Sequence, residues 1–270
     1  MNVIYLALCD SAENLKACFR LDECGIDDAS DILHSLQTVV KKHILSLPSV
    51  ENLDKKIKKV STYAAHSTKF TAELKNQQKL LDPECTPLVL EQDCPTRWNI
   101  KFYIFKCMLR LKRALMNTMM EVQSWASYKN SIIYDVEITH RDWQLMEQVI
   151  EVLEPFEQAT RMLSSSQACI SSVIPVITTI INGLEEICSG NEKGVKTMAK
   201  NLKNGMEAKF KFIETDKKYI MTTALDPRFK TSFFRFNETT SIIKNAKNYL
   251  KNLWMMISFL LLDQVRYSLI

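Results

Sequence analysis

The adjacent pair Arg97-Trp98 has the clearest potential for contact chemistry in the chain. A tryptophan ring can stack on a nucleic-acid base while a neighbouring guanidinium neutralises a phosphate. Lys101 follows shortly after and is a third candidate for nucleic-acid binding. Trp98 also shares helical spacing with Phe102 and Phe105, which is typical of the first core anchor of a helix. The sequence therefore leaves two interpretations of Trp98 open, nucleic-acid contact and core packing.

A carboxylate, Asp10, directly follows the apolar run at residues 3–8 (VIYLAL) and precedes a helical pattern. One carboxylate at a strand end cannot assemble a two-metal site by itself, because such sites need several acidic ligands around the ions. The alternative is that Asp10 or Ser11 caps the helix that follows.

The eight cysteines are scattered along the chain, and no pair has Cys-x2-Cys spacing. A zinc site made from Cys18, Cys24 and His34 would have spacings unlike those of structural zinc sites. A chain of this size does not need disulfides, so reduced thiols in a cytosolic or nuclear protein are the favoured interpretation. We predict no metal site and no cofactor in this chain.

Basic residues cluster in three places, at residues 55–59 (KKIKK), at 110–113 (RLKR) and along 193–218. Solvated helix faces have the same composition. The functional alternative is a surface that follows a phosphate backbone, which would bind with a steep dependence on salt.

The composition is that of a globular, mainly helical protein. The 270 residues carry a net charge of +4 and are 46% hydrophobic, with only 5 Gly and 7 Pro. So few breakers favour long elements. The apolar run at 253–262 (LWMMISFLLL) is shorter than the roughly 18–20 residues that span a bilayer, and the N-terminus lacks the features of a signal peptide. We expect no membrane association.

The apolar run at 3–8 is the only clear strand pattern, and a lone strand needs partners for its backbone groups. From residue 30 onward the pattern is helical. We predict helical stretches near 32–44, 50–81, 98–119, 139–154, 173–188 and 193–213, with a loop at 82–87 (DPECTP). Pro155 is expected to kink or restart its helix, and Thr139 to Asp142 resembles a capping box.

Several segments together resemble the hAT-superfamily transposases and their domesticated relatives with BED-type zinc fingers. The segment at 93–99 (DCPTRWN) is similar to the family's D-x-x-T-R-W-N-S helix start, with Ile100 where Ser is usual. The segment from Trp143 to Thr160 is similar to its "W…vLkPFeeaT" stretch. The segments SSVIP at 171–175 and LDPRFK at 225–230 follow in the family's order, while LCDSAENLKA and HSLQTVVKKHI match upstream segments.

The resemblance implies an RNase H-like fold interrupted by a large all-α insertion. We expect a partial RNase H-like domain at 1–48, the helical insertion at 49–236 and a divergent tail at 237–270. The family's catalytic site binds Mg²⁺ or Mn²⁺, and Asp10 aligns with its second catalytic Asp. The BED finger with its Zn²⁺, the first catalytic strand, and the C-terminal segment with the catalytic Glu and dimerisation surface are expected to be missing.

The predicted function is that of a truncated, transposase-derived nuclear protein without catalysis, which retains at most weak DNA contact. The alternative belongs to another class: a helical scaffold that binds protein partners through exposed Met and aromatic residues at 102–120.

Overall fold

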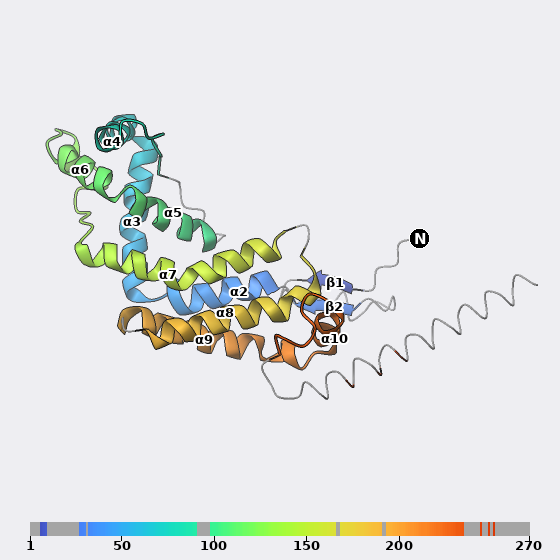
Figure 1. Ribbon diagram of the computed structural model, residues 1–270. Helices are drawn as coiled ribbons and strands as arrows, with labels where there is room; N and C mark the ends of the chain where they lie inside the picture. The colour runs from blue at the N-terminus through green and yellow to red at the C-terminus, as the bar shows by residue number, and fades with distance from the viewer. Residues whose placement is uncertain are drawn as a thin grey trace, which may run out of the picture.

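The structure is a computed structural model that describes residues 6–9, 27–30, 32–90, 98–165, 168–190 and 193–234, together with Lys244, Asn248 and Lys251. It is mainly helical, as predicted. Its helices form two groups, which are called the bundle and the arm, and a short pair of strands lies at one end of the bundle (Figure 1).

The strands β1 (Leu6–Cys9) and β2 (Asp27–Ser30) pair in parallel, with Leu6 opposite Asp27 and Cys9 opposite Ser30. The strand predicted at 3–8 is confirmed in part, at Leu6–Cys9, and β2 supplies the partner that its backbone groups need. The sequence DDAS has no apolar alternation, so β2 forms through backbone pairing with β1 rather than through its own propensity.

The bundle consists of α2 (Ile32–Val40), α7 (His140–Leu163), α8 (Val173–Ser189) and α9 (Lys193–Phe210), which lie side by side (Figure 1). A π-helical turn, η1 (Lys41–Leu45), extends α2 and also packs on α9. Residues 170–189 are long and apolar enough by composition to cross a membrane, yet most of this stretch is buried against its neighbours, as a central bundle helix requires.

The arm consists of α3 (Pro48–His66), α4 (Thr68–Leu81), α5 (Trp98–Arg110) and α6 (Lys112–Gln123). The helix α4 packs on α3 and α6, and α5 joins the arm to the bundle by packing on α7. The stretch predicted at 50–81 is two helices, because Ser67 ends α3 and its hydroxyl caps the start of α4.

The helix α7 begins with the predicted capping box, in which the Thr139 hydroxyl accepts from the Asp142 backbone and the Asp142 carboxylate accepts from the Thr139 backbone. It then continues through Pro155 to Leu163, so of the two outcomes expected there, a kink or a restart, the restart does not occur. Buried side chains on both sides of the proline, Leu153 and Phe156, anchor the helix in the core across the missing hydrogen bond.

Short elements close the described chain. The 3₁₀ turns are η2 (Tyr128–Asn130), η3 (Ile170–Ser172) and η4 (Lys211–Glu214), and the last helix is α10 (Lys217–Leu225). The helix α10 packs against η3 and α8, near the strands in Figure 1. The buried apolar side chains of both groups form one continuous core.

Candidate nucleic-acid interface

The structure describes two of the four predicted site residues, because Asp10 and Arg97 lie outside the described residues. Trp98 is the first residue of α5 and is 2% exposed, with its ring edge-to-face against Phe102 at 6.5 Å between centroids. A ring buried to this extent does not offer a face on which a base could stack. Its position is that of the core anchor, which was the alternative interpretation.

Lys101 forms an ion pair across the arm. Its Nζ donates to Asp54 Oδ2 of α3 at 2.5 Å, and both side chains are largely buried. The positive charge of Lys101 is therefore offset by a carboxylate, and the residue ties α5 to α3.

A lysine-rich hollow of about 650 Å³ lies along α3 between Asn52 and Thr62. One wall is α3 and the other is the loop that follows η2. Lys55, Lys58 and Lys59 are exposed, and Asp135 is the one acidic residue in the lining. The lining residues are Asn52, Lys55, Lys56, Lys58, Lys59, Thr62, Ile132, Asp135 and Val136.

The amphipathic pattern of α3 explains why these lysines share a surface. Val50, Leu53, Ile57 and Val60 form its buried stripe, so the intervening lysines face outward. The opposite wall is fixed because Ile133 and Val136 are themselves buried in the core.

Lys56 has a separate structural role within the hollow. Its Nζ donates to Asp142 Oδ2 of the capping box at 2.7 Å, which links the arm to the start of α7. Burial raises the pKa of Asp142, but the hydrogen bonds from Lys56 and Thr139 outweigh it, so the pKa lies below the usual value.

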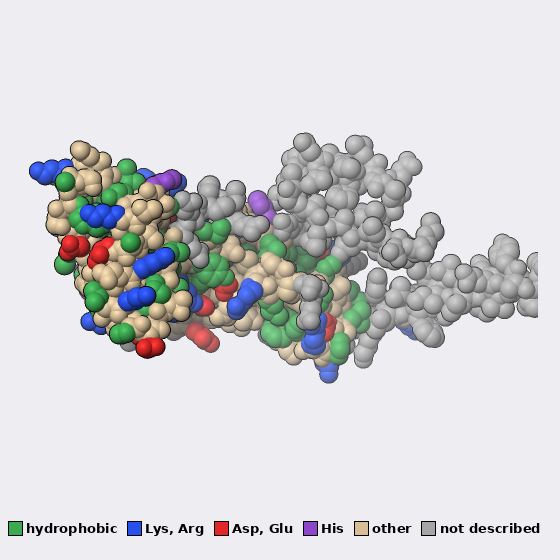
Figure 2. Space-filling view, turned by 90° about the horizontal axis from the view of Figure 1, so that it is seen from above, with side chains coloured by type: hydrophobic (Ala, Val, Ile, Leu, Met, Phe, Trp, Pro, Cys, Tyr) green, Lys and Arg blue, Asp and Glu red, His purple; other side chains and the backbone are tan. Residues whose placement is uncertain are grey.

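The other two basic clusters are partly offset by acids. Lys112 lies 3.7 Å from Glu147, and Lys203 lies 2.9 Å from Glu185. Figure 2 shows Lys and Arg side chains spread over the upper face of the arm, with Asp and Glu among them. The α3 hollow is therefore the better candidate, because it gathers several lysines with a single acid in its lining.

The hollow can bind phosphates but offers little that would distinguish bases. Lysine ammonium groups attract a phosphate backbone and release its counterions, whereas sequence is read by contacts to base edges. Among the described residues, no group of three or more His, Cys, Asp or Glu side chains could hold a metal ion.

The segments SSVIP at 171–175 and LDPRFK at 225–230 meet in space. The Ser171 hydroxyl donates to Asp226 Oδ2 at 2.7 Å, and the Thr223 hydroxyl donates to the Ser171 carbonyl at 3.0 Å. The Arg228 guanidinium donates to the same Asp226 carboxylate at 2.7 Å. These contacts hold α10 against η3, so SSVIP and LDPRFK form one structural clamp.

The clamp also contains a thiol that the sequence did not single out. Cys169 Sγ lies 2.9 Å from Ser171 Oγ and 3.2 Å from Ser172 Oγ, and Arg228 Nη2 donates to it at 3.1 Å. The hydrogen bonds from Ser171, Ser172 and Arg228 lower the pKa of this exposed thiol to about 7, against a smaller opposing effect of burial. No spacing rule could have found it, because Arg228 lies far along the chain.

Curated proteins that match the chain include Zinc finger BED domain-containing protein 4 from Homo sapiens, which is 28% identical over 205 residues, or 76% of this chain and 16% of that protein. Zinc finger BED domain-containing protein 6 is 26% identical in Homo sapiens, over 89% of this chain and 24% of that protein. The Mus musculus form of protein 6 is 26% identical over 78% of this chain and 21% of that protein.

The chain thus spans between about a sixth and a quarter of the length of these relatives. No protein-family profile matches it. No solved structure matches it either.

Proposed function

Because the chain is related to the hAT-derived zinc finger BED domain-containing proteins, we propose that it is a nuclear protein of transposase origin that contacts nucleic acid and has no catalytic activity. The contact is made to the phosphate backbone by the lysines of the α3 hollow. The observation that carries this proposal is the gathering of three exposed lysines, Lys55, Lys58 and Lys59, around a hollow with one acid in its lining.

On the basis of this transposase origin, we also propose an identity for the strands. The parallel pair β1–β2 is the remnant of an RNase H-like sheet, and the helices from α3 onward belong to the insertion that interrupts it. The proposed boundary at residues 48 and 49 falls at the N-terminus of α3, where Pro48 occupies the first turn. The parallel direction of the two strands supports this assignment, because such a pair requires a crossover connection.

A salt titration with a charge-reversal pair tests the nucleic-acid contact. The variant Lys55→Glu/Lys59→Glu removes two exposed lysines of the hollow that lie one helical turn apart. We expect weaker binding of a labelled oligonucleotide in fluorescence anisotropy, and a slope of log affinity against log salt reduced by about one per lysine.

The matched control is Lys75→Glu/Lys79→Glu, which changes two exposed lysines of α4 at the same spacing and gives the same net charge. If both pairs weaken binding equally, only overall charge matters and the hollow is not the site. Absence of binding at 50 mM salt contradicts the proposed contact altogether.

The proposed lack of catalysis is tested separately. The purified chain is incubated with supercoiled DNA and Mg²⁺ or Mn²⁺, with Asp10→Ala as the control. Nicking by the chain that Asp10→Ala abolishes contradicts this part of the proposal.

A second candidate function, protein binding by the helical region, is favoured by an apolar surface on the arm. Met116 and Met120 are exposed one turn apart on α6, at 43% and 66%, and Leu80 is 69% exposed at the end of the adjacent α4. By contrast, Phe102 and Phe105, from the same predicted surface, are buried. Exposed methionines adapt to varied partners, so this function predicts that Met120→Lys impairs partner capture without affecting nucleic-acid binding.

A further inference from the structure

The two walls of the α3 hollow differ in chemistry. The wall formed by α3 carries the three exposed lysines. The facing wall, which is called the loop wall, is formed by residues 132–136 and presents the apolar side chains of Ile132 and Val136 and the carboxylate of Asp135. Ile132 is 51% exposed, so it offers apolar surface to a molecule that enters. The hollow therefore has one wall that attracts phosphates and another that favours an apolar surface.

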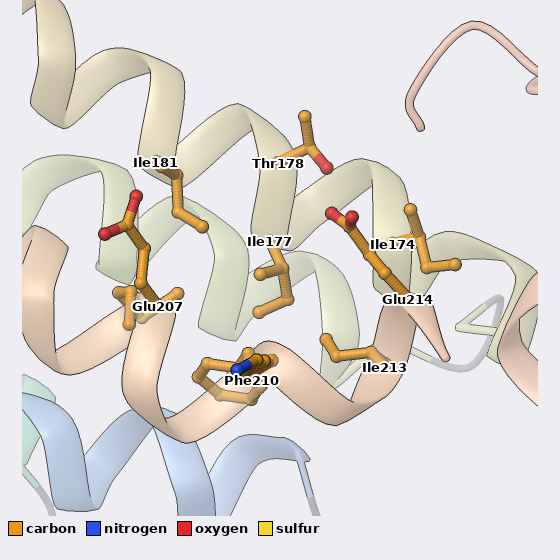
Figure 3. Close-up of a pocket in the computed structure, with 10 residues that line it drawn as sticks. Ile174, Ile177, Thr178, Ile181, Glu207, Phe210, Ile213 and Glu214 are labelled. Carbon is orange, nitrogen blue, oxygen red and sulfur yellow. The ribbon is translucent and has the colours of Figure 1, made fainter. Parts of the chain in front are cut away.

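A second hollow, of about 400 Å³ between α8 and the chain from the end of α9 to η4, lacks this asymmetry. Ile177 of α8 and Phe210 of α9 line it from its two sides (Figure 3). Its lining contains one lysine, Lys211, together with two glutamates. It therefore has no basic wall for a phosphate backbone, and the α3 hollow is the better site for a polyanion.

A single nucleic-acid strand has the same two-sided character as the α3 hollow. Its phosphates lie along one edge, and its bases, whose faces are not covered by a partner strand, lie along the other. A duplex instead carries phosphates on both sides of each groove and keeps its base faces stacked inside. Because the carboxylate of Asp135 repels phosphates, the loop wall favours bases over a second backbone.

The shape of the hollow also disfavours a duplex. An α-helix with its side chains is about 10–12 Å across and already fills a major groove about 12 Å wide. The lysine-bearing side of α3 faces the loop wall, which is fixed because Ile133 and Val136 are buried in the core. A duplex that took this side of α3 into its groove would therefore collide with the loop wall.

An exposed aromatic ring lies in the loop that forms the loop wall. Tyr134 directly precedes the lining residue Asp135 and is 47% exposed. Its ring is edge-to-face against Tyr128 at 5.3 Å between centroids, and the Tyr128 hydroxyl donates to the Tyr134 carbonyl at 2.9 Å. A ring held in this way stacks on a base with little further loss of conformational entropy. Trp125 is a poorer platform, because Lys69 Nζ lies 4.0 Å from its ring centroid.

From these observations we infer that the α3 hollow binds single-stranded nucleic acid in preference to duplex, an inference that rests on the nucleic-acid contact proposed above. The phosphates of the strand lie against Lys55, Lys58 and Lys59. Its bases face the loop wall, and one base stacks on the ring of Tyr134. Because every base has a face that can stack, the site has little sequence preference.

Fluorescence anisotropy with two labelled probes of equal length, oligothymidylate and its duplex with oligoadenylate, tests this inference. If the lysines acted alone, the higher charge density of the duplex would make it the better ligand. We expect the opposite order, with the single strand bound several-fold more tightly by the wild type at the same salt concentration.

Two variants of Tyr134 test the stacking. Tyr134→Leu keeps an apolar side chain but loses the aromatic face, so it should weaken single-strand binding on the order of tenfold and leave duplex binding unchanged. Tyr134→Phe is the matched control, because it keeps the ring and should bind both probes as the wild type does. Neither variant removes the hydrogen bond from Tyr128, since its acceptor is a backbone carbonyl.

Two results would overturn the inference. The first is a wild type that binds the duplex as tightly as the single strand or more tightly. If Lys55→Glu/Lys59→Glu then weakens binding of both probes, the proposed contact stands and only the preference for a single strand fails. The second is equal single-strand binding by Tyr134→Leu and Tyr134→Phe, which would show that no base stacks on this ring. Absence of binding to both probes contradicts the proposed contact itself and the inference with it.

Discussion

The bundle and the arm are both built from helices, but their helices differ in how many residues they bury. The central helix α8 buries nine of its 17 residues, whereas α3 of the arm buries six of its 19. A helix surrounded by neighbours must be apolar on nearly all sides, while a helix at the edge keeps one face for water. The lysines that form the candidate interface can therefore collect on the arm, where no packing is lost by placing them.

The two regions also meet through different interactions. Apolar contact between α5 and α7 is supplemented by the ion pair from Lys56 to Asp142, which joins the arm to the first turn of α7. The bundle is held by side chains such as Phe156 and Leu184, which are fully buried. We therefore expect substitutions in the core of the bundle to destabilise the whole molecule. Substitutions at the junction should weaken mainly the attachment of the arm.

The largest effect is expected from Phe156→Ala in the bundle. Loss of a fully buried ring leaves a cavity, so the free energy of unfolding should fall by about 3–5 kcal/mol in urea denaturation. Phe70→Ala in the arm creates a similar cavity but should accelerate hydrogen exchange mainly in α3, α4 and α6. If Phe70→Ala accelerates hydrogen exchange equally in α8 and α9, the bundle and the arm unfold as one unit, which would contradict the distinction between them.

A smaller, pH-dependent effect is expected at the junction from Lys56→Met. The lowered pKa of Asp142 means that its ionised form stabilises the fold above the unfolded pKa of about 3.9 and that this stability is lost as pH falls through the folded pKa. The variant should lose about 1 kcal/mol at pH 7 and approach the wild type near pH 2 in thermal unfolding. Lys58→Met, whose side chain is exposed in the same hollow, is the control; a deficit in Lys56→Met that does not depend on pH would contradict the role of the ion pair.

The smallest effect on stability is expected at the clamp, around Cys169. Its effect on the reactivity of the Cys169 thiol should nevertheless be clear. Its alkylation rate by iodoacetamide should rise with a midpoint near pH 7, because the thiolate is the reactive form. Ser171 has one hydroxyl hydrogen, which it shares between Asp226 and the sulfur. Arg228 can therefore donate to the thiolate more consistently than Ser171 does. The variant Arg228→Gln should raise the pH midpoint of Cys169 alkylation.

Because the folded pKa of Cys169 is lowered, its contribution to stability is complete above the unfolded pKa and disappears as pH falls through about 7. Equal alkylation midpoints for Cys169 in the wild type and in Arg228→Gln would contradict the effect of the clamp.

Local chemistry made much of the helical structure predictable. The capping box at Thr139 and the lysine-rich helix at 193–213 followed from residues within a few positions of one another, and both are confirmed. The features that local chemistry did not decide depend on competition between local and long-range effects. The helix does not restart at Pro155, where buried neighbours hold both sides, and the strand at Asp27–Ser30 formed in a sequence with no strand pattern.

By itself the sequence determined the helical period, the apolar stripes and the position of the lysines opposite those stripes, because each depends on side chains that share one helix. Only the tertiary structure decided which charges are offset, as for Lys101 beside Asp54, and which stay exposed around a hollow, as for Lys59. The same holds for the clamp, where Cys169, Asp226 and Arg228 come together. Coulombic and hydrogen-bond energies depend on distance in space, and folding alone sets that distance for residues far apart in the chain.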